Sequence, residues 1–245
     1  MRKAFGWSLD QWIFYGGYPG AAGLIKEEEA WSSYVTDSLI ETVLAKDILQ
    51  LQTVAKPALL RHLFLLACGT PSQILSYNKM LGQLHDAGNT TTLAHYLKLL
   101  EAAFLVSGLE SFKRGKQKKR GSSPKLILWN NALINAVTGE FFSESAANHS
   151  WWGRLVENAV GAHLLNSLAG RPCKLYYWRE RHLKVDFVLE TPKQTWAIEV
   201  KSGKLSTMQG MRKFCELYPE THPLVIGSNE MKLEDFFSSR PIRDW

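Results

Sequence analysis

The chain has 245 residues, of which 45% are hydrophobic and 21% charged, and its formal net charge is +6. This length and composition are typical of a soluble globular protein with one large domain or two small ones. No apolar run approaches the ~20 residues that a membrane-spanning helix needs, and the N-terminus lacks the apolar core of a signal peptide. The three cysteines show no metal-ligand spacing. We therefore expect a cytoplasmic protein that has no membrane partner.

The first half of the chain carries apolar side chains at helical spacing. Together with the turn residues between them, these patterns predict helices over residues 31–52, 57–69, 72–84 and 91–105. Thr36 or Asp37 is a plausible cap for the first helix, and Thr90–Thr92 cap the last one.

A strongly basic stretch follows these helices. The sequence KRGKQKKRGSSPK, from Lys113 to Lys125, contains seven cations and no acid. Without these seven cations the chain would carry a net charge of 6 − 7 = −1, so the basic character is local. Such a stretch is either a solvated linker or a surface for an anionic partner. Strands expected near 108–112 and 125–129 would make it the wing of a winged helix-turn-helix.

The winged-helix interpretation points to DNA as a partner, because wings of this kind commonly contact phosphates and a neighbouring helix enters a groove. The recognition helix would be the segment 91–105, whose exposed face offers few side chains for reading bases. A winged helix that contacts proteins is therefore an open alternative. The candidate nucleic-acid-binding residues are His95 and Lys98 on the helix and Lys113, Arg114, Lys116, Lys118, Lys119 and Arg120 in the wing.

The second half of the chain predicts alternating helices and strands. An amphipathic helix spans Trp151–Ala169 and carries Glu157 beside its apolar stripe, where the carboxylate would at least complement the positive helix N-terminus. The elements expected after it are a strand at 174–178, two strands within 183–203, a helix at 206–218 and a strand at 223–227.

The two central strands form a hairpin around the turn residues Thr191–Gln194. A turn centred between Pro192 and Lys193 pairs Val185 with Val200, Phe187 with Ile198 and Leu189 with Trp196, which places these apolar side chains on one face. The same register sets Asp186 opposite Glu199 on the other face, with Lys201 two residues further. Directly opposed carboxylates repel each other unless a cation lies between them. A divalent metal is the obvious candidate, although a solvated polar face is the alternative.

An Asp followed by Glu-x-Lys on the next strand resembles the signature of the PD-(D/E)XK nuclease superfamily. The resemblance implies that Asp186 and Glu199 hold Mg²⁺ or Mn²⁺ and that Lys201 positions and polarises the attacking water. It also implies that Glu157, on the first core helix, reaches the metal site. The expected order α-β-β-β-α-β is similar to the superfamily core.

Over nearly its whole length the chain resembles the C-terminal region of prokaryotic AAA-type ATPases, in which a winged helix and a PD-(D/E)XK-like domain follow the ATPase module. The matching blocks are YGGYPG at 15–20, Lys46-Asp47, TTLAHYLKLLEAAFLV at 91–106, PKLILWNNAL at 124–133, GRLVEN at 153–158, YYWRERHLKVDFVLE at 176–190 and AIEVKSG at 197–203. The ATPase module would precede YGGYPG, and the sequence contains no GxxxxGK[ST] loop. We therefore expect no ATP binding or hydrolysis by this chain.

Together these observations predict an α+β protein. We expect an N-terminal helical segment at 1–52, a winged helix-turn-helix at 53–130 and a restriction-endonuclease-like domain at 131–245. The expected function is Mg²⁺-dependent hydrolysis of DNA phosphodiester bonds. The alternatives are a DNA-binding module that does not cleave and an interaction or regulatory module that works through a protein partner or a homo-oligomer.

Overall fold

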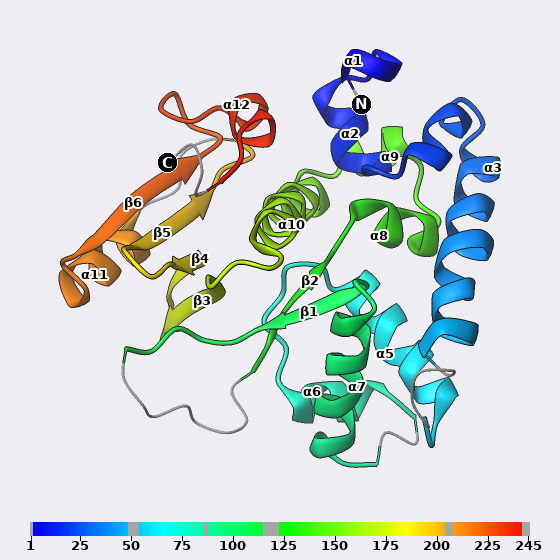
Figure 1. Ribbon diagram of the computed structural model, residues 1–245, viewed down its shortest axis with the longest axis horizontal. Helices are drawn as coiled ribbons and strands as arrows, with labels where there is room; N and C mark the ends of the chain where they lie inside the picture. Colours follow the sequence, from blue (N-terminus) through cyan, green and yellow to red (C-terminus); the bar gives the residue numbers. More distant parts are fainter. Residues whose placement is uncertain (1, 49–53, 86–87, 115–122, 204–207, 242–245) are drawn as a thin grey trace.

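The structure is a computed structural model that describes residues 2–48, 54–85, 88–114, 123–203 and 208–241. The chain is an α+β protein, with helices around a two-stranded hairpin in its N-terminal half and a four-stranded sheet in its C-terminal half (Figure 1). In the described part of the chain, no helix is both long and apolar enough to cross a membrane.

The N-terminal half begins with short helices. They are α1 (Arg2–Phe5), α2 (Leu9–Tyr15), the 3₁₀ helix η1 (Pro19–Leu24), α3 (Glu28–Ser33) and the π-helical segments η2 (Tyr34–Ile40) and η3 (Val43–Asp47). The helical stretch begins at Glu28, so the predicted cap at Thr36 or Asp37 is wrong. Both residues lie inside the stretch because its buried apolar side chains already start at Trp31.

Three helices and a hairpin follow, and they have the expected order. They are α5 (Pro57–Gly69), α6 (Tyr77–Gln83), α7 (Thr90–Ala102), β1 (Val106–Leu109) and β2 (Lys125–Leu128). Helix α5 has the predicted bounds, whereas α6 starts at Tyr77 because Ser76 caps it. Asn89, and not a threonine, caps α7, because its side chain accepts a hydrogen bond from the Thr92 amide.

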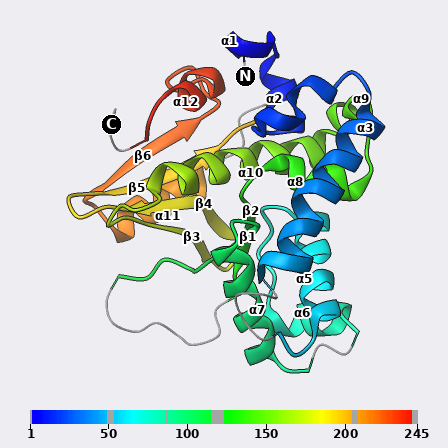
Figure 2. The same ribbon diagram turned by 45° about the vertical axis from the view of Figure 1, so that its right-hand side comes forward.

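Helix α10 (His149–Leu168) connects the two halves of the molecule. It follows α8 (Asn131–Thr138) and α9 (Phe142–Ala147) and lies between the N-terminal helices and the C-terminal sheet (Figure 2). Leu155 and Val156 in its first half belong to the N-terminal core. Leu164 and Leu168 in its second half pack in the core beneath the sheet. Helix α10 therefore contributes side chains to both hydrophobic cores and connects them.

The C-terminal sheet has the strand order β3-β4-β5-β6. Its elements are β3 (Lys174–Glu180), β4 (Leu183–Glu190), β5 (Thr195–Val200), α11 (Gln209–Leu217) and β6 (Thr221–Ile226), followed by α12 (Leu233–Ser238). The first three strands are antiparallel, and β6 runs parallel to β5 after the crossover through α11. Helix α10 covers one face of the sheet and α11 the other.

The predicted hairpin register is confirmed where β4 and β5 pair, because Phe187 faces Ile198 and Leu189 faces Trp196. The prediction that Val185 shares their face is wrong: Val185 packs in the cluster on the α11 side. The pairing of β3 with β4 shifts by one residue between Tyr176 and Trp178. This β-bulge leaves two β4 residues opposite one β3 residue. Side chains that precede Phe187 on β4 therefore point to the opposite face from the one that strict alternation predicts.

The N-terminal hairpin is hydrogen-bonded to the C-terminal sheet. Beyond β1, the Phe112 amide donates to the Tyr177 carbonyl at 2.6 Å, and the Tyr177 amide donates to the Glu110 carbonyl at 3.1 Å. The Asn158 side chain of α10 accepts from the Leu128 amide at 2.9 Å and donates to the Leu128 carbonyl at 3.0 Å. The hairpin is thus attached both to the outer edge of β3 and to α10.

Candidate functional site

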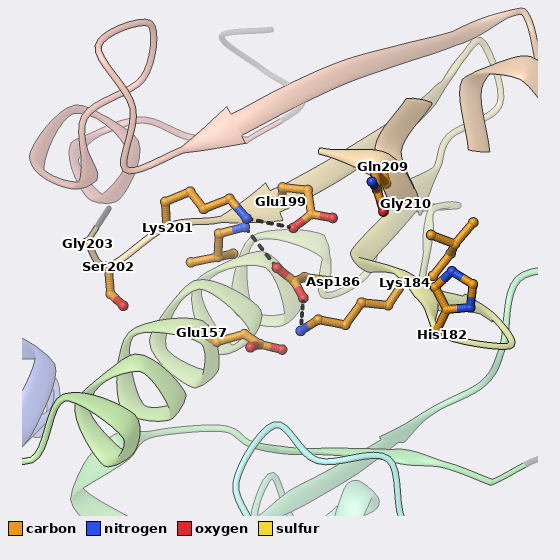
Figure 3. A pocket seen from close by; sticks show the side chains of 12 residues that line it. Glu157, His182, Lys184, Asp186, Glu199, Lys201, Ser202, Gly203, Gln209 and Gly210 are labelled. Atoms are coloured by element: carbon orange, nitrogen blue, oxygen red, sulfur yellow. Dashed lines mark hydrogen bonds and ion pairs between the residues drawn. The ribbon is translucent and has the colours of Figure 1, made fainter. Parts of the chain in front are cut away.

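Two of the four predicted catalytic side chains come from strands of the sheet, one directly follows a strand and the fourth comes from α10, and all four line one pocket of about 470 Å³. Asp186 lies on β4, Glu199 lies near the end of β5, Lys201 directly follows that strand, and Glu157 faces them from α10 (Figure 3). Ser202, Gly203, Gln209 and Gly210, from the segment after β5 and the start of α11, also line it. The structure therefore brings together residues that are 44 positions apart in the chain.

The Asp186 carboxylate terminates the hydrogen-bonding ladder between β4 and β5. Its Oδ2 accepts from the Val200 amide at 3.0 Å, and its Oδ1 accepts from Lys184 Nζ at 2.9 Å. The side chain is only 3% exposed. Because Asp186 is one of the two residues in the bulge, local backbone geometry and not strict alternation directs its carboxylate.

Glu199 near the end of β5 and Lys201 just after that strand interact with each other. Lys201 Nζ lies 3.3 Å from Glu199 Oε2, and both side chains are largely buried. The backbone of Lys201 is held by its amide, which donates to the Ile226 carbonyl at 2.8 Å. Gly227 lies against the Lys201 carbonyl so closely that a Cβ there would come within 1.9 Å of it. The neighbouring strand β6 therefore fixes the position of Lys201.

Glu157 forms an ion pair with a residue that the sequence interpretation placed elsewhere. Lys125 Nζ lies 2.5 Å from Glu157 Oε1 and donates to the Asp186 carbonyl at 2.7 Å. Counting Lys125 with the solvated basic stretch was wrong, because it is the first residue of β2 and is only 3% exposed. A signal existed in its spacing from Ile127, a core residue two positions later on the same strand face.

Each acid in the pocket thus has a lysine partner. The pairs are Glu157 with Lys125, Asp186 with Lys184, and Glu199 with Lys201. Three carboxylates and three ammonium groups give a formally neutral site. The partners differ in exposure, because the Lys184 side chain is 59% exposed and that of Lys125 is 3% exposed. Lys184 can swing into solvent, whereas Lys125 cannot leave without opening the fold.

The local electrostatics separate the proton affinities of the three carboxyls. Burial, reinforced by the charge of Asp186, raises the pKa of Glu199 to about 7. Burial also acts to raise the pKa of Asp186, but the charges of Lys125 and Lys184 hold it below its ordinary value. Burial raises the pKa of Glu157, and its attraction to Lys125 offsets this only in part. Asp186 is therefore the carboxyl most firmly ionised at neutral pH.

The donor set fits a divalent metal such as Mg²⁺. The Asp186 and Glu199 side chains line the same pocket and the charge of Asp186 helps to raise the pKa of Glu199, so two hard oxygen ligands face the same space. Mg²⁺ keeps several waters and needs few protein ligands. In the described part of the chain, no three His, Cys, Asp or Glu side chains form a metal-binding group.

The candidate nucleic-acid-binding residues that the structure describes do not line this pocket. His95 and Lys98 are exposed on α7, and Lys113 and Arg114 are exposed after β1. Arg114 forms an exposed ion pair with Glu220 at 2.7 Å, which offsets its charge. The candidates that lie outside the described residues are Lys116, Lys118, Lys119 and Arg120.

The structure shows an α+β protein with a pocket of paired acids and lysines. Comparison with family models identifies the family to which the chain belongs. Residues 6–144 match the model described as a domain of unknown function (DUF8612). This match spans more than half of the chain, so the chain belongs to that family. Residues 152–242 match a second domain of unknown function (DUF4143), which is commonly associated with AAA-ATPase-containing proteins. Searches of curated proteins and of solved structures returned no match.

Proposed function

We propose that the chain is a Mg²⁺-dependent nuclease of the PD-(D/E)XK type, which hydrolyses phosphodiester bonds of DNA at the pocket around Asp186. The observation that carries the proposal is that the Asp186 and Glu199 carboxyls line one open pocket together with Lys201, which is paired with Glu199. The succession α10-β3-β4-β5-α11-β6 supports a restriction-endonuclease-like class for this half of the chain.

Each residue of the pocket has a role that follows from its position. Asp186 and Glu199 would hold the metal, which supplies Lewis acidity and lowers the pKa of a bound water. Lys201 is largely buried beside Glu199, so it orients the attacking water and stabilises negative charge that develops on the phosphate. Glu157 assists from the wall of the pocket as a further ligand or as a base.

The DNA part of the proposal rests on the N-terminal half. Helices α5, α6 and α7 followed by the β1–β2 hairpin have the order of a winged helix-turn-helix. The basic residues of the predicted wing lie in the connection between the two hairpin strands. Helix α7 is the recognition helix in this scheme, and His95 and Lys98 are on its exposed side.

The decisive test compares the wild type with Asp186→Asn. In the wild type, Mg²⁺ at 100 times its dissociation constant adds about 2.7 kcal/mol of stability, and the protein nicks or linearises plasmid DNA. Asp186→Asn loses both effects because a neutral amide is a weak ligand for Mg²⁺. It remains folded, because the Asn oxygen can still accept from the Val200 amide. Thermal unfolding with and without Mg²⁺ and a plasmid-cleavage assay measure the outcome.

Glu190→Gln is the matched control. This acid lies at the other end of β4, where it accepts a hydrogen bond from Tyr176 at 3.3 Å. It should keep both the metal-dependent stabilisation and the cleavage of the wild type. Equal metal-dependent stabilisation of the wild type and Asp186→Asn would refute the assignment of the metal site.

A second candidate function is a DNA-binding module that does not cleave. The neutralisation of every acid by a lysine favours it, because such a site is electrostatically satisfied without a metal. The two candidates differ in one result. A non-cleaving module retards DNA in a gel but leaves plasmid intact at any Mg²⁺ or Mn²⁺ concentration.

A further inference from the structure

Lys125 is the one residue of the N-terminal hairpin that reaches the acids of the candidate site in the described part of the chain. It lies within the DUF8612 match, whereas Glu157, Asp186 and Glu199 lie within the DUF4143 match. Its ammonium group contacts both Glu157 and the Asp186 backbone carbonyl. Its Nζ also lies 4.2 Å from the centre of the Phe187 ring. The contacts around this single cation therefore span both family-matched regions.

The strand that carries Lys125 is firmly placed against α10. At the far end of β2, Asn158 binds both the amide and the carbonyl of Leu128. Between these two points Ile127 is fully buried in the core beneath the sheet. Two consecutive residues of α10, Glu157 and Asn158, thus hold the two ends of β2, and the position of the Lys125 side chain is fixed by the docking of the strand.

We propose that Lys125 is a positioning residue, which sets the conformation of Asp186 by binding the backbone carbonyl of Asp186. The candidate metal site then depends on the docking of the N-terminal half of the chain. The carbonyl belongs to a bulge residue that is freed from regular pairing with β3. Holding this carbonyl at 2.7 Å restricts the rotation of the peptide unit and so orients the carboxylate toward the Val200 amide.

This role is distinct from neutralising Glu157, and a pair of variants separates the two. Glu157→Gln removes the ion pair but keeps Lys125 and its bond to the Asp186 carbonyl. Adding Lys125→Met to this variant removes that bond as well, while the unbranched Met side chain still packs on Phe187. Since the double variant leaves no buried unpaired charge, it avoids the cost of an isolated ion in the core.

The first readout is hydrogen exchange of the Val200 amide in the metal-free protein, because this amide donates directly to the Asp186 carboxylate. We expect it to exchange at least about tenfold faster in the double variant than in Glu157→Gln. The Ile198 amide, two residues earlier on β5 where the strand pairs regularly with β4, reports general loosening and should change little. Equal Val200 exchange in the two variants, or equal acceleration at Val200 and Ile198, would overturn the proposal.

The second readout is Mn²⁺ affinity, measured by titration calorimetry, and this part rests on the proposed function. The double variant should bind Mn²⁺ at least about tenfold more weakly than Glu157→Gln, and equal affinities contradict the positioning role. If the wild type binds no Mn²⁺, the proposed function fails, whereas the exchange of the Val200 amide still decides the role of Lys125.

Discussion

At the scale of single residues, the candidate site shows how burial and charge together set the chemistry of ordinary side chains. Glu199 and Asp186 are both carboxyls at the same end of the hairpin, yet burial and repulsion raise the pKa of one while two lysines lower that of the other. The partners of Asp186 that act on it most strongly are Lys125 and Lys184, from different halves of the chain. The identity of a residue alone therefore does not determine its role.

His163 on α10 provides a pH-dependent test of burial at the same scale. Burial lowers its pKa, although its Nε2 contacts the Ser239 carbonyl at 3.2 Å. The unfolded chain, in which the pKa is about 6.5, therefore binds more protons than the folded one. Stability should be fully present above pH 6.5 and should fall as the pH drops through that value, by at most about 1.4 kcal/mol per pH unit.

The comparison variant is His163→Gln, which cannot titrate. Urea unfolding between pH 5 and 8 should show a smaller loss of stability at acidic pH for the variant than for the wild type. The two aromatic neighbours, Phe236 and Phe237, remain in both proteins. Parallel stability curves would show that the folded protein accommodates the charged imidazole without cost.

At the scale of elements, the close approach of α10 to the sheet determines where Glu157 lies. Gly161 is the point of contact: a Cβ there would lie 2.9 Å from the Phe187 ring and 3.1 Å from Ile127 Cγ2. Both of these side chains are fully buried. The helix can pack this closely because the residue at this position has no side chain.

Gly161→Ala should therefore destabilise the protein by about 1–3 kcal/mol, the usual cost of overpacking a core. The higher helix propensity of alanine offsets up to about 1 kcal/mol of that cost. Gly82→Ala in α6 is the matched control, because a Cβ there meets no atom within 4 Å. Chemical denaturation should show a loss for the first variant and no change or a gain for the second. Similar effects of both substitutions would contradict the close packing of α10.

At the scale of the whole molecule, the two halves share hydrogen bonds, a helix and a buried ion pair. The segment after β1 pairs with β3, and Asn158 and Glu157 bind β2. DNA that contacts the basic stretch would therefore bind a segment whose flanking strand is packed against the elements that form the pocket. The Arg114–Glu220 ion pair places the start of this stretch beside the loop before β6.

The basic stretch makes a prediction about DNA affinity. If four cations contact phosphates, log K should fall against log salt concentration with a slope of about −3.6, at about 0.9 per contact. Replacing Lys116, Lys118, Lys119 and Arg120 by Ser should remove most of that slope and leave the unfolding midpoint unchanged. Fluorescence anisotropy with duplex DNA at several salt concentrations measures it. An unchanged affinity and slope would identify the stretch as a solvated linker.

Several features of this protein were determined by local sequence patterns. The bounds of α5 followed from Pro57 and Gly69, and the register of β4 on β5 followed from the alternation of Phe187 and Leu189 around a short turn. The same register predicted that the strand carrying Glu199 pairs with the strand carrying Asp186. These features depend on residues close together in the chain, so their spacing carries the necessary information.

Other features were decided only by the tertiary structure. The bulge at Asp186 depends on how β3 meets β4, and it moved Val185 to the opposite face. The burial of Lys125 depends on the docking of β2 against α10, and in the sequence only its two-residue spacing from Ile127 distinguishes it from the exposed Lys113 and Arg114. The free energy of a buried charge comes from partners that are distant in the chain, here Glu157 and the Asp186 carbonyl, and these meet only when both halves are folded.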